Sequence, residues 1–226
     1  MTDRPLIIEM VGVAGAGKST LREILRQRDG TIQFRVPPQK IGYLPFLIKQ
    51  LFTRPPIYFF KNRTHRCFTW EEIKIMAYLE TWIPHLQKQA AEKDIVCVLD
   101  PGSVYWLTTI REFGPESARR PKMVRWWNEK LRQWGQALGL IIWLDAPDEL
   151  LLHRVLTRDE WHPVKTQSPE ETLEQFSRLR KGYEEIIDLM TSQGGPPVLK
   201  FRTDQMAPKE IADRVFAEAK LNAATC

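Results

Sequence analysis

Residues Gly12 to Thr20 read G-V-A-G-A-G-K-S-T, which matches the Walker A or P-loop pattern G-x-x-x-x-G-K-S/T. An apolar run of strand length, residues 6–11, precedes this stretch, and residues 21–26 follow it with helical spacing. Its glycines let the backbone wrap closely around a phosphate, whose charge the start of a helix attracts. The stretch therefore predicts a nucleoside-triphosphate site, and a glycine-rich turn with a chance lysine is the alternative.

The loop residues have distinct expected roles. Lys18 would reach the β- and γ-phosphates, and the Ser19 hydroxyl would bind Mg²⁺. The residues expected to contact the nucleotide are Gly12, Gly15, Ala16, Gly17, Lys18, Ser19 and Thr20. A nucleoside triphosphate and Mg²⁺ are thus the expected cofactors.

Composition and charge exclude several classes of protein. A chain of 226 residues with 43% hydrophobic and 27% charged residues is typical of a soluble globular protein. The net charge of +5 suits polyanionic nucleotides, but no basic block resembles a nucleic-acid-binding arm, so we expect no nucleic-acid partner. We find no signal-peptide pattern and no apolar run of membrane-spanning length, so we expect no membrane partner. Cys67, Cys97 and Cys226 lack metal-binding spacing and fit a reducing, cytoplasmic location, with Cys97 in the core.

Strand-like and helix-like segments alternate along the chain. The predicted strands are residues 6–11, 31–36, 95–99, 140–145 and 198–201. The predicted helices follow the P-loop to about residue 28 and then cover about 69–92, 104–113, 116–138, 147–158, 170–190 and 208–220. Thr69 and Glu72 form an expected capping box, and Pro84 is expected to kink the helix that they start. This alternation predicts a parallel sheet within one domain, residues 1–226.

Two aspartates end apolar strands, where parallel sheets bind ligands. Asp100 is the stronger candidate for holding the Mg²⁺ shell or handling an acceptor proton, since a buried acid without a charge partner is costly. Asp145 is the second candidate. Either residue could instead cap the turn that follows it, and for Asp145 this is the preferred interpretation.

Arg154 and Arg158 are spaced to share one face of a helix. They lead into a polar, proline-bounded segment whose length suits a mobile lid, about residues 157–169. Guanidinium groups suit phosphate oxygens, and phosphoryl transfer needs cations around the moving group. The alternative is a solvated helix face. His162 could touch phosphate, but a lone loop histidine is more often exposed, and Lys165 follows it.

Several stretches resemble the nucleoside/nucleotide kinase group of P-loop kinases, and thymidylate kinases in particular. They are the P-loop with its strand, the strand ending in Asp100, residues 144–149 followed by Arg154 and Arg158, and residues 179–184. The resemblance implies an α/β fold, namely a P-loop NTPase three-layer sandwich with a five-stranded parallel sheet, helices on both faces and a lid. It also implies an ATP:acceptor phosphotransferase in which the lid arginines clamp phosphates and one of them, Arg154, contacts ATP. The acceptor would bind over about residues 38–92 and near Asp100.

The chain departs from the group at two positions. Thymidylate kinases usually carry Asp-Arg at the end of the third strand, whereas this chain has Asp100-Pro101. Deoxynucleoside kinases place an acid after strand two, where residues 36–39 read V-P-P-Q. A nucleotide, a nucleoside, another metabolite and an antibiotic therefore stay open as acceptors. Arg63 and Arg66 could supply a phosphate clamp or could simply be solvated.

Aromatic residues cluster in two parts of the chain. Those that could line an acceptor pocket, or pack in the core, are Tyr43, Phe46, Phe52, Tyr58, Phe59, Phe60 and Trp70. Trp126, Trp127 and Trp134 are expected to pack internally, or to form a subunit contact if exposed. A homodimer stays open.

The favoured hypothesis is an ATP-dependent kinase that transfers the γ-phosphoryl group to a small-molecule acceptor. A nucleotide or nucleoside is the preferred candidate for this acceptor. Its expected catalytic residues are Lys18, Asp100, Arg154 and Arg158, and Ser19 and Asp100 are the expected metal ligands. A GTPase-like switch would need a guanine-reading Asn-Lys-x-Asp segment, which we do not find. A nucleic-acid-end kinase or remodelling ATPase would need a larger basic surface or motor motifs, and an inactive kinase would not need the intact lysine, serine and acid.

Overall fold

The computed structural model describes residues 6–35, 68–93, 95–159 and 161–225. Five parallel strands form one sheet in the order β2-β3-β1-β4-β5. The strands are β1 (Ile7–Val11), β2 (Ile32–Arg35), β3 (Val96–Leu99), β4 (Leu140–Asp145) and β5 (Val198–Arg202). The apolar runs predicted as strands are therefore confirmed, and β1, which carries the P-loop at its carboxyl end, is buried at every position.

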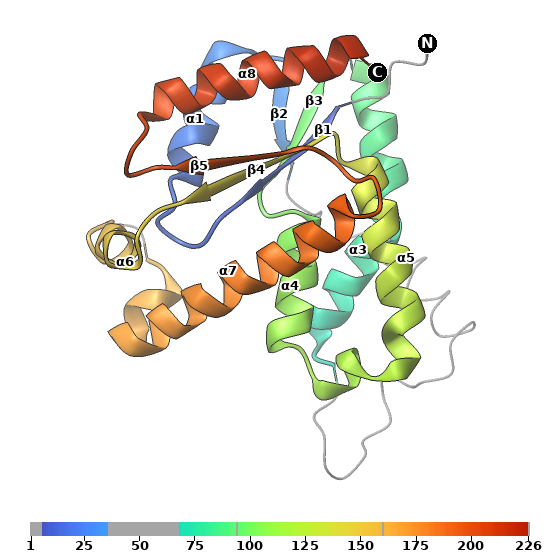
Figure 1. Ribbon diagram of the computed structural model, residues 1–226, viewed down its shortest axis with the longest axis vertical. Helices are drawn as coiled ribbons and strands as arrows, with labels where there is room; N and C mark the ends of the chain where they lie inside the picture. Colours follow the sequence, from blue (N-terminus) through green and yellow to red (C-terminus); the bar gives the residue numbers. More distant parts are fainter. Residues whose placement is uncertain (1–5, 36–67, 94, 160, 226) are drawn as a thin grey trace.

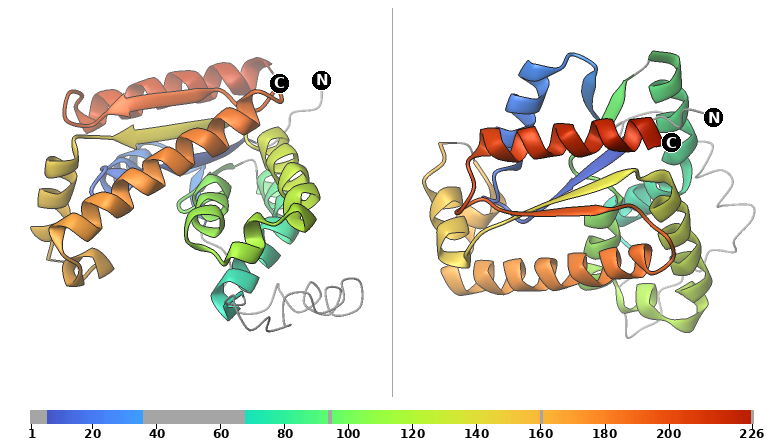
Figure 2. Two further views of the ribbon diagram at one scale, coloured as in Figure 1. Left: turned by 60° about the horizontal axis from the view of Figure 1, so that its bottom comes forward. Right: turned by 45° about the horizontal axis from the view of Figure 1, so that its top comes forward.

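Helices cover both faces of this sheet, as Figures 1 and 2 show. On one face lie α1 (Lys18–Arg28) and α8 (Pro208–Thr225). On the other lie α3 (Trp70–Lys93), α4 (Ser103–Phe113), α5 (Val124–Ala137) and α7 (Pro169–Thr191). The short helix α6 (Asp148–Leu156) follows the carboxyl end of β4. The predicted three-layer α/β sandwich is confirmed.

Local signals account for several helix boundaries. The capping box at the start of α3 is present, because the Thr69 N–H donates to Glu72 Oε2 at 2.7 Å and the Glu72 N–H donates to Thr69 Oγ1 at 3.2 Å. A second box starts α7, where Ser168 and Glu171 make the same reciprocal pair. Pro84 lies inside α3.

Two predicted helices have different bounds. The helix expected over residues 116–138 is divided into the 3₁₀ turns η1 (Glu116–Arg119) and η2 (Pro121–Met123) and then α5. Pro121 explains the division, because proline forces the preceding residue out of the helical region, and Arg120 is extended. The helix expected to reach residue 158 ends at Leu156, and its C-cap is Thr157. Arg154 and Arg158 therefore do not share a helix face, and that expectation was wrong.

The core contains the residues expected to pack inside. Cys97 is fully buried in β3. Trp126 and Trp134 are buried between α5 and α3, where Trp126 Nε1 donates to Glu80 Oε1 at 2.7 Å and Trp134 Nε1 donates to the Leu79 carbonyl at 3.0 Å. Internal packing of these tryptophans is thus confirmed. Among the described residues, no helix combines the length and apolar composition that a membrane span requires.

Candidate active site

The P-loop joins β1 to α1 and packs closely against β4 and α6. Gly12 has φ 155°, and a Cβ on it would lie 2.5 Å from the Leu144 carbonyl oxygen. Gly15 has φ 80°, and its Cβ would lie 2.6 Å from the carbonyl oxygen of Leu151. Both positions therefore require glycine for backbone conformation and for space. Gly17 is the left-handed N-cap of α1, and Ala16 is buried beneath the loop.

Lys18 folds back over this loop from the first turn of α1. Its Nζ donates to the carbonyl oxygens of Gly12 at 2.6 Å and Val13 at 3.0 Å. Burial lowers the pKa of Lys18, Arg158 lowers it further, and Asp100 opposes both effects. The ammonium thus lies in a desolvated position where an anionic ligand would be favourable. The Ser19 and Thr20 side chains are exposed beside it.

Asp100 follows β3 directly and is half-buried. Burial raises the pKa of its carboxyl, whereas the charges of Lys18 and Arg22 lower it. Asp100 therefore lies close enough to Lys18 for their charges to interact, and both side chains line one cavity.

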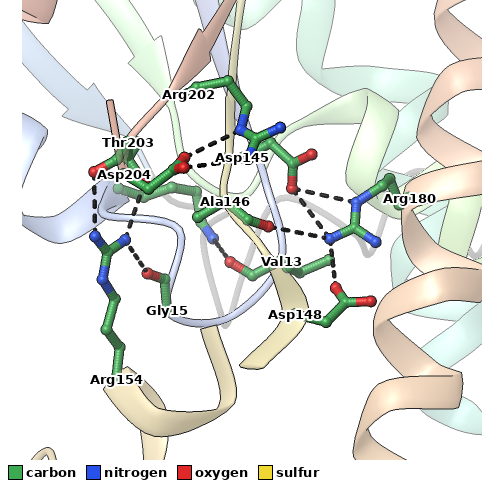
Figure 3. A network of polar contacts seen from close by, with 11 residues as sticks. Val13, Gly15, Asp145, Ala146, Asp148, Arg154, Arg180, Arg202, Thr203 and Asp204 are labelled. Atoms are coloured by element: carbon green, nitrogen blue, oxygen red, sulfur yellow. Dashed lines mark hydrogen bonds and ion pairs between the residues drawn. The ribbon is translucent and has the colours of Figure 1, made fainter. Parts of the chain in front are cut away.

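Asp145 has a different environment at the end of β4 (Figure 3). Its Oδ1 accepts hydrogen bonds from Nε and Nη2 of Arg180 in α7, each at 3.2 Å. The same Nη2 donates to Asp148 Oδ1 at 2.7 Å. The carboxylate thus anchors α7 against the carboxyl end of β4. The sequence suggested that Asp145 caps the turn that follows it, and it did not indicate this long-range ion pair with Arg180.

Arg154 connects the P-loop to the segment after β5 (Figure 3). Its Nη1 donates to Thr203 Oγ1 at 2.9 Å and to the Gly15 carbonyl at 3.3 Å, and its Nη2 donates to the Thr203 carbonyl at 3.1 Å. Arg154 is therefore placed at the phosphate loop, where a nucleotide ligand could meet it.

The segment expected to form a lid contains the 3₁₀ turn η3 (Pro163–Thr166). His162 starts this turn, and its Nδ1 accepts a hydrogen bond from the Val164 N–H at 3.2 Å. It is half-buried, contrary to the expectation of an exposed loop histidine. Burial lowers the pKa of His162, and the charges of Arg158, Lys18 and Lys165 lower it further. The segment thus brings further cations close to Lys18.

A cavity of about 260 Å³ lies between the P-loop, α4, the η3 segment and α7. Its polar lining includes Lys18, Asp100, Tyr105, His162, Gln175 and Tyr183. Phe176, Leu179 and Val164 supply apolar walls. The sequence placed Lys18 and Asp100 here, but gave no role to Tyr105, Gln175, Phe176 or Tyr183. Only the resemblance of residues 179–184 to the helix after the lid pointed to this part of α7.

Part of the predicted acceptor region lies outside the described residues. This applies to residues 38–67, including Arg63, Arg66 and the aromatic residues 43–60. Residues 68–92 belong mainly to α3, and they contribute none of the described residues that line the cavity.

The oxygen donors near the P-loop fit the expected Mg²⁺. Ser19 offers a hydroxyl and Asp100 a carboxylate, and Mg²⁺ typically takes one or two protein oxygens and completes its shell with water and phosphate. The described residues contain no group of three or more His, Cys, Asp or Glu side chains that could hold a metal by itself. The donor set therefore suits an ion bound chiefly through the nucleotide.

Comparisons with known proteins support the fold and leave the sequence family open. No protein-family model and no curated protein matches the chain. Solved structures of deoxyadenosine kinase from M. mycoides match 96% of this chain and 100% of theirs. The structure with bound dATP and the structure with the products dCMP and a flexible dCDP each have a TM-score of 0.55 at 16% identity. The structure with bound dCTP has a TM-score of 0.52 at 15% identity. The chain thus has the fold of the nucleoside kinase group of P-loop kinases.

Proposed function

We propose that this protein is an ATP-dependent kinase that transfers the γ-phosphoryl group to a hydroxyl of a small acceptor, with a nucleoside as the first candidate. The observation that carries the proposal is one cavity that contains both Lys18 of the P-loop and Asp100, with the η3 segment on another side. The deoxyadenosine kinases of the same fold bind dATP, dCTP or dCMP, which supports a nucleotide-handling enzyme.

In this proposal Lys18 exchanges its partners when ATP binds. Its ammonium leaves the carbonyl oxygens of Gly12 and Val13 and binds the β- and γ-phosphate oxygens. Arg158 and Lys165 add positive charge from the lid, because the transition state spreads negative charge over the transferring group. Mg²⁺, held by Ser19 together with the phosphates, would neutralise part of that charge.

Asp100 orients the acceptor and accepts its hydroxyl proton. Burial raises the pKa of the Asp100 carboxyl and so makes it a better base, while Lys18 and Arg22 favour its ionised form. The oxygen atom of the acceptor would then attack the γ-phosphorus as its proton moves to the carboxylate, the bond from the γ-phosphorus to the bridging oxygen would break, and ADP would leave.

The cavity favours an uncharged acceptor. Its apolar wall comes from Val164, Phe176 and Leu179, and the described lining contains no arginine. A phosphate on the acceptor would also meet the negative charge of Asp100. One observation supports a nucleoside monophosphate instead, because Arg22 lies close enough to Asp100 to lower its pKa.

The test is ADP release from Mg²⁺-ATP with a panel of nucleosides, their monophosphates and small hydroxylated metabolites. A nucleoside should stimulate release, and Lys18→Ala should abolish it. Lys181→Ala is the matched control, since this lysine is exposed on α7. Hydrolysis that no acceptor stimulates, with GTP preferred over ATP, would contradict the kinase and favour the switch. The cytoplasmic location, the absence of a nucleic-acid partner and the homodimer stay predictions.

A further inference from the structure

A single carboxylate lies inside the central strand of the sheet. Glu9 belongs to β1, and its side chain is 0% exposed. One of its oxygens, Oε2, accepts a hydrogen bond from Ser103 Oγ at 2.8 Å. The other, Oε1, accepts from the N–H groups of Val104 at 2.8 Å and Tyr105 at 3.2 Å. Glu9 therefore binds the first turn of α4, the helix that follows Asp100.

The pairing of β1 with β3 holds the other end of the same turn. In the register of β1 and β3, Glu9 is paired with Leu99, the residue directly before Asp100. The sheet thus holds Leu99 opposite Glu9, and the Glu9 carboxylate holds Ser103 to Tyr105. Between these two attachments lie only Asp100, Pro101 and Gly102.

The start of α4 needs an acceptor of this kind. Its N-cap is Gly102, which has no side chain to receive the N–H groups of the first turn. Water is excluded here, so an unpaired N–H would be costly, and a negative charge at a helix N-terminus is favourable. Gly102 also makes room for the carboxylate, because a Cβ at this position would lie 2.4 Å from Glu9 Cδ. Glu9 and Gly102 are therefore matched to each other.

We propose that Glu9 is a positioning residue that holds Asp100 near Lys18, because its carboxylate fixes the helix end of the turn that carries Asp100 while the sheet holds the other end. The same contact places Tyr105, whose N–H binds Glu9 and whose ring lines the cavity. The inference rests on the proposed function to the extent that Asp100 acts on the acceptor. Misplacing a reacting group by about 1 Å is enough to slow catalysis on the order of 100-fold.

Two variants of Glu9 and one control test the proposal. In Glu9→Ala the first turn of α4 loses its acceptors, so kcat should fall at least about tenfold while the KM for ATP changes less than about twofold. In Glu9→Gln the amide oxygen still accepts from Val104 and Tyr105, so most of the turnover should return. The matched control is Lys130→Met in α5, because Lys130 is a buried charged residue (1% exposed) that pairs with Glu80 at 3.2 Å and does not line the cavity.

Amide hydrogen exchange gives a readout that does not depend on catalysis. Glu9→Ala should lose protection at Val104 and Tyr105, whereas Glu9→Gln should keep it and Lys130→Met should leave it unchanged. Undiminished kcat in Glu9→Ala, or an equal loss of kcat in Lys130→Met, would overturn the positioning role. If the wild type phosphorylates no acceptor, the proposed function fails by itself. Hydrogen exchange in Glu9→Ala then tests the positioning role without catalysis. Loss of amide protection confined to residues 100–107 supports this role, and loss of protection spread evenly over the sheet overturns it.

Discussion

Replacing Glu9 by Gln should flatten the dependence of folding stability on pH. Burial raises the pKa of Glu9 from 4.5 to about 7, although the hydrogen bonds from Val104, Ser103 and Tyr105 oppose the rise. Glutamine keeps the shape and the acceptor oxygen of the side chain but cannot titrate. The difference between the two proteins across pH therefore isolates this one carboxyl group.

The sign and size follow from the two pKa values. The folded protein binds the proton more tightly than the unfolded chain, so the stabilisation is full below about pH 4.5 and is lost as pH rises towards about pH 7. The complete change is roughly 3 kcal/mol, of which about 2.5 kcal/mol falls between about pH 5 and pH 8. Above that range the contribution of Glu9 is constant.

Urea denaturation at a series of pH values measures the effect. The unfolding free energy of the wild type should fall relative to that of Glu9→Gln by about 2.5 kcal/mol from about pH 5 to pH 8. Glu171→Gln is the matched control, since Glu171 also caps a helix N-terminus but is exposed. Parallel pH curves for the wild type and Glu9→Gln would refute the reasoning, because Glu9 would then titrate alike in the folded and unfolded chains.

Four further substitutions separate the other roles. Asp100→Asn should lower turnover on the order of 100-fold while ATP still binds in calorimetry, and unchanged turnover would exclude Asp100 as the base. Arg154→Met should weaken ATP binding about tenfold, because the contacts of Arg154 with the P-loop are lost. Arg158→Met should instead reduce kcat more than ATP affinity, and equal effects of the two substitutions would contradict this division of roles. Arg180→Met leaves Asp145 without its guanidinium partner, so the unfolding free energy should fall by roughly 1–3 kcal/mol, and a variant as stable as the wild type would contradict the anchoring role.

Features with a local cause were predictable from sequence. The strands β1 and β4 are continuous apolar runs, and the capping box of Thr69 and Glu72 starts α3 as expected. The end of α6 had no such signal, because no glycine or proline follows it before Pro163. The helix ends where Thr157 Oγ1 donates to the His153 carbonyl at 2.8 Å. A threonine of this kind is equally compatible with a continuing helix, so sequence alone extended α6 too far.

The residues of the site also divide into those that a local sequence signal predicts and those that it does not. Lys18 and Asp100 are predictable, since a motif and a strand end fix their places. The pair of Asp145 and Arg180 joins residues that are 35 positions apart, and nothing in the local sequence indicates it. Glu9 did leave a signal, namely one carboxylate within the apolar run of residues 6–11. A charge in a strand buried on both faces needs partners, but the sequence does not indicate which helix start supplies them.

The two aspartates at the carboxyl ends of β3 and β4, the strands on either side of β1, each lie near a cation, but the two cations have different partners. Asp145 binds a guanidinium that is held at the same time by Asp148, so the positive charge of Arg180 is already matched within the protein. Asp100 faces an ammonium whose hydrogen bonds go to the carbonyl oxygens of Gly12 and Val13, which carry no net charge. Phosphate oxygens would be stronger acceptors for this ammonium. We therefore predict that the P-loop cation changes partners when an anion enters, and that Asp100 is the carboxylate that acts beside it.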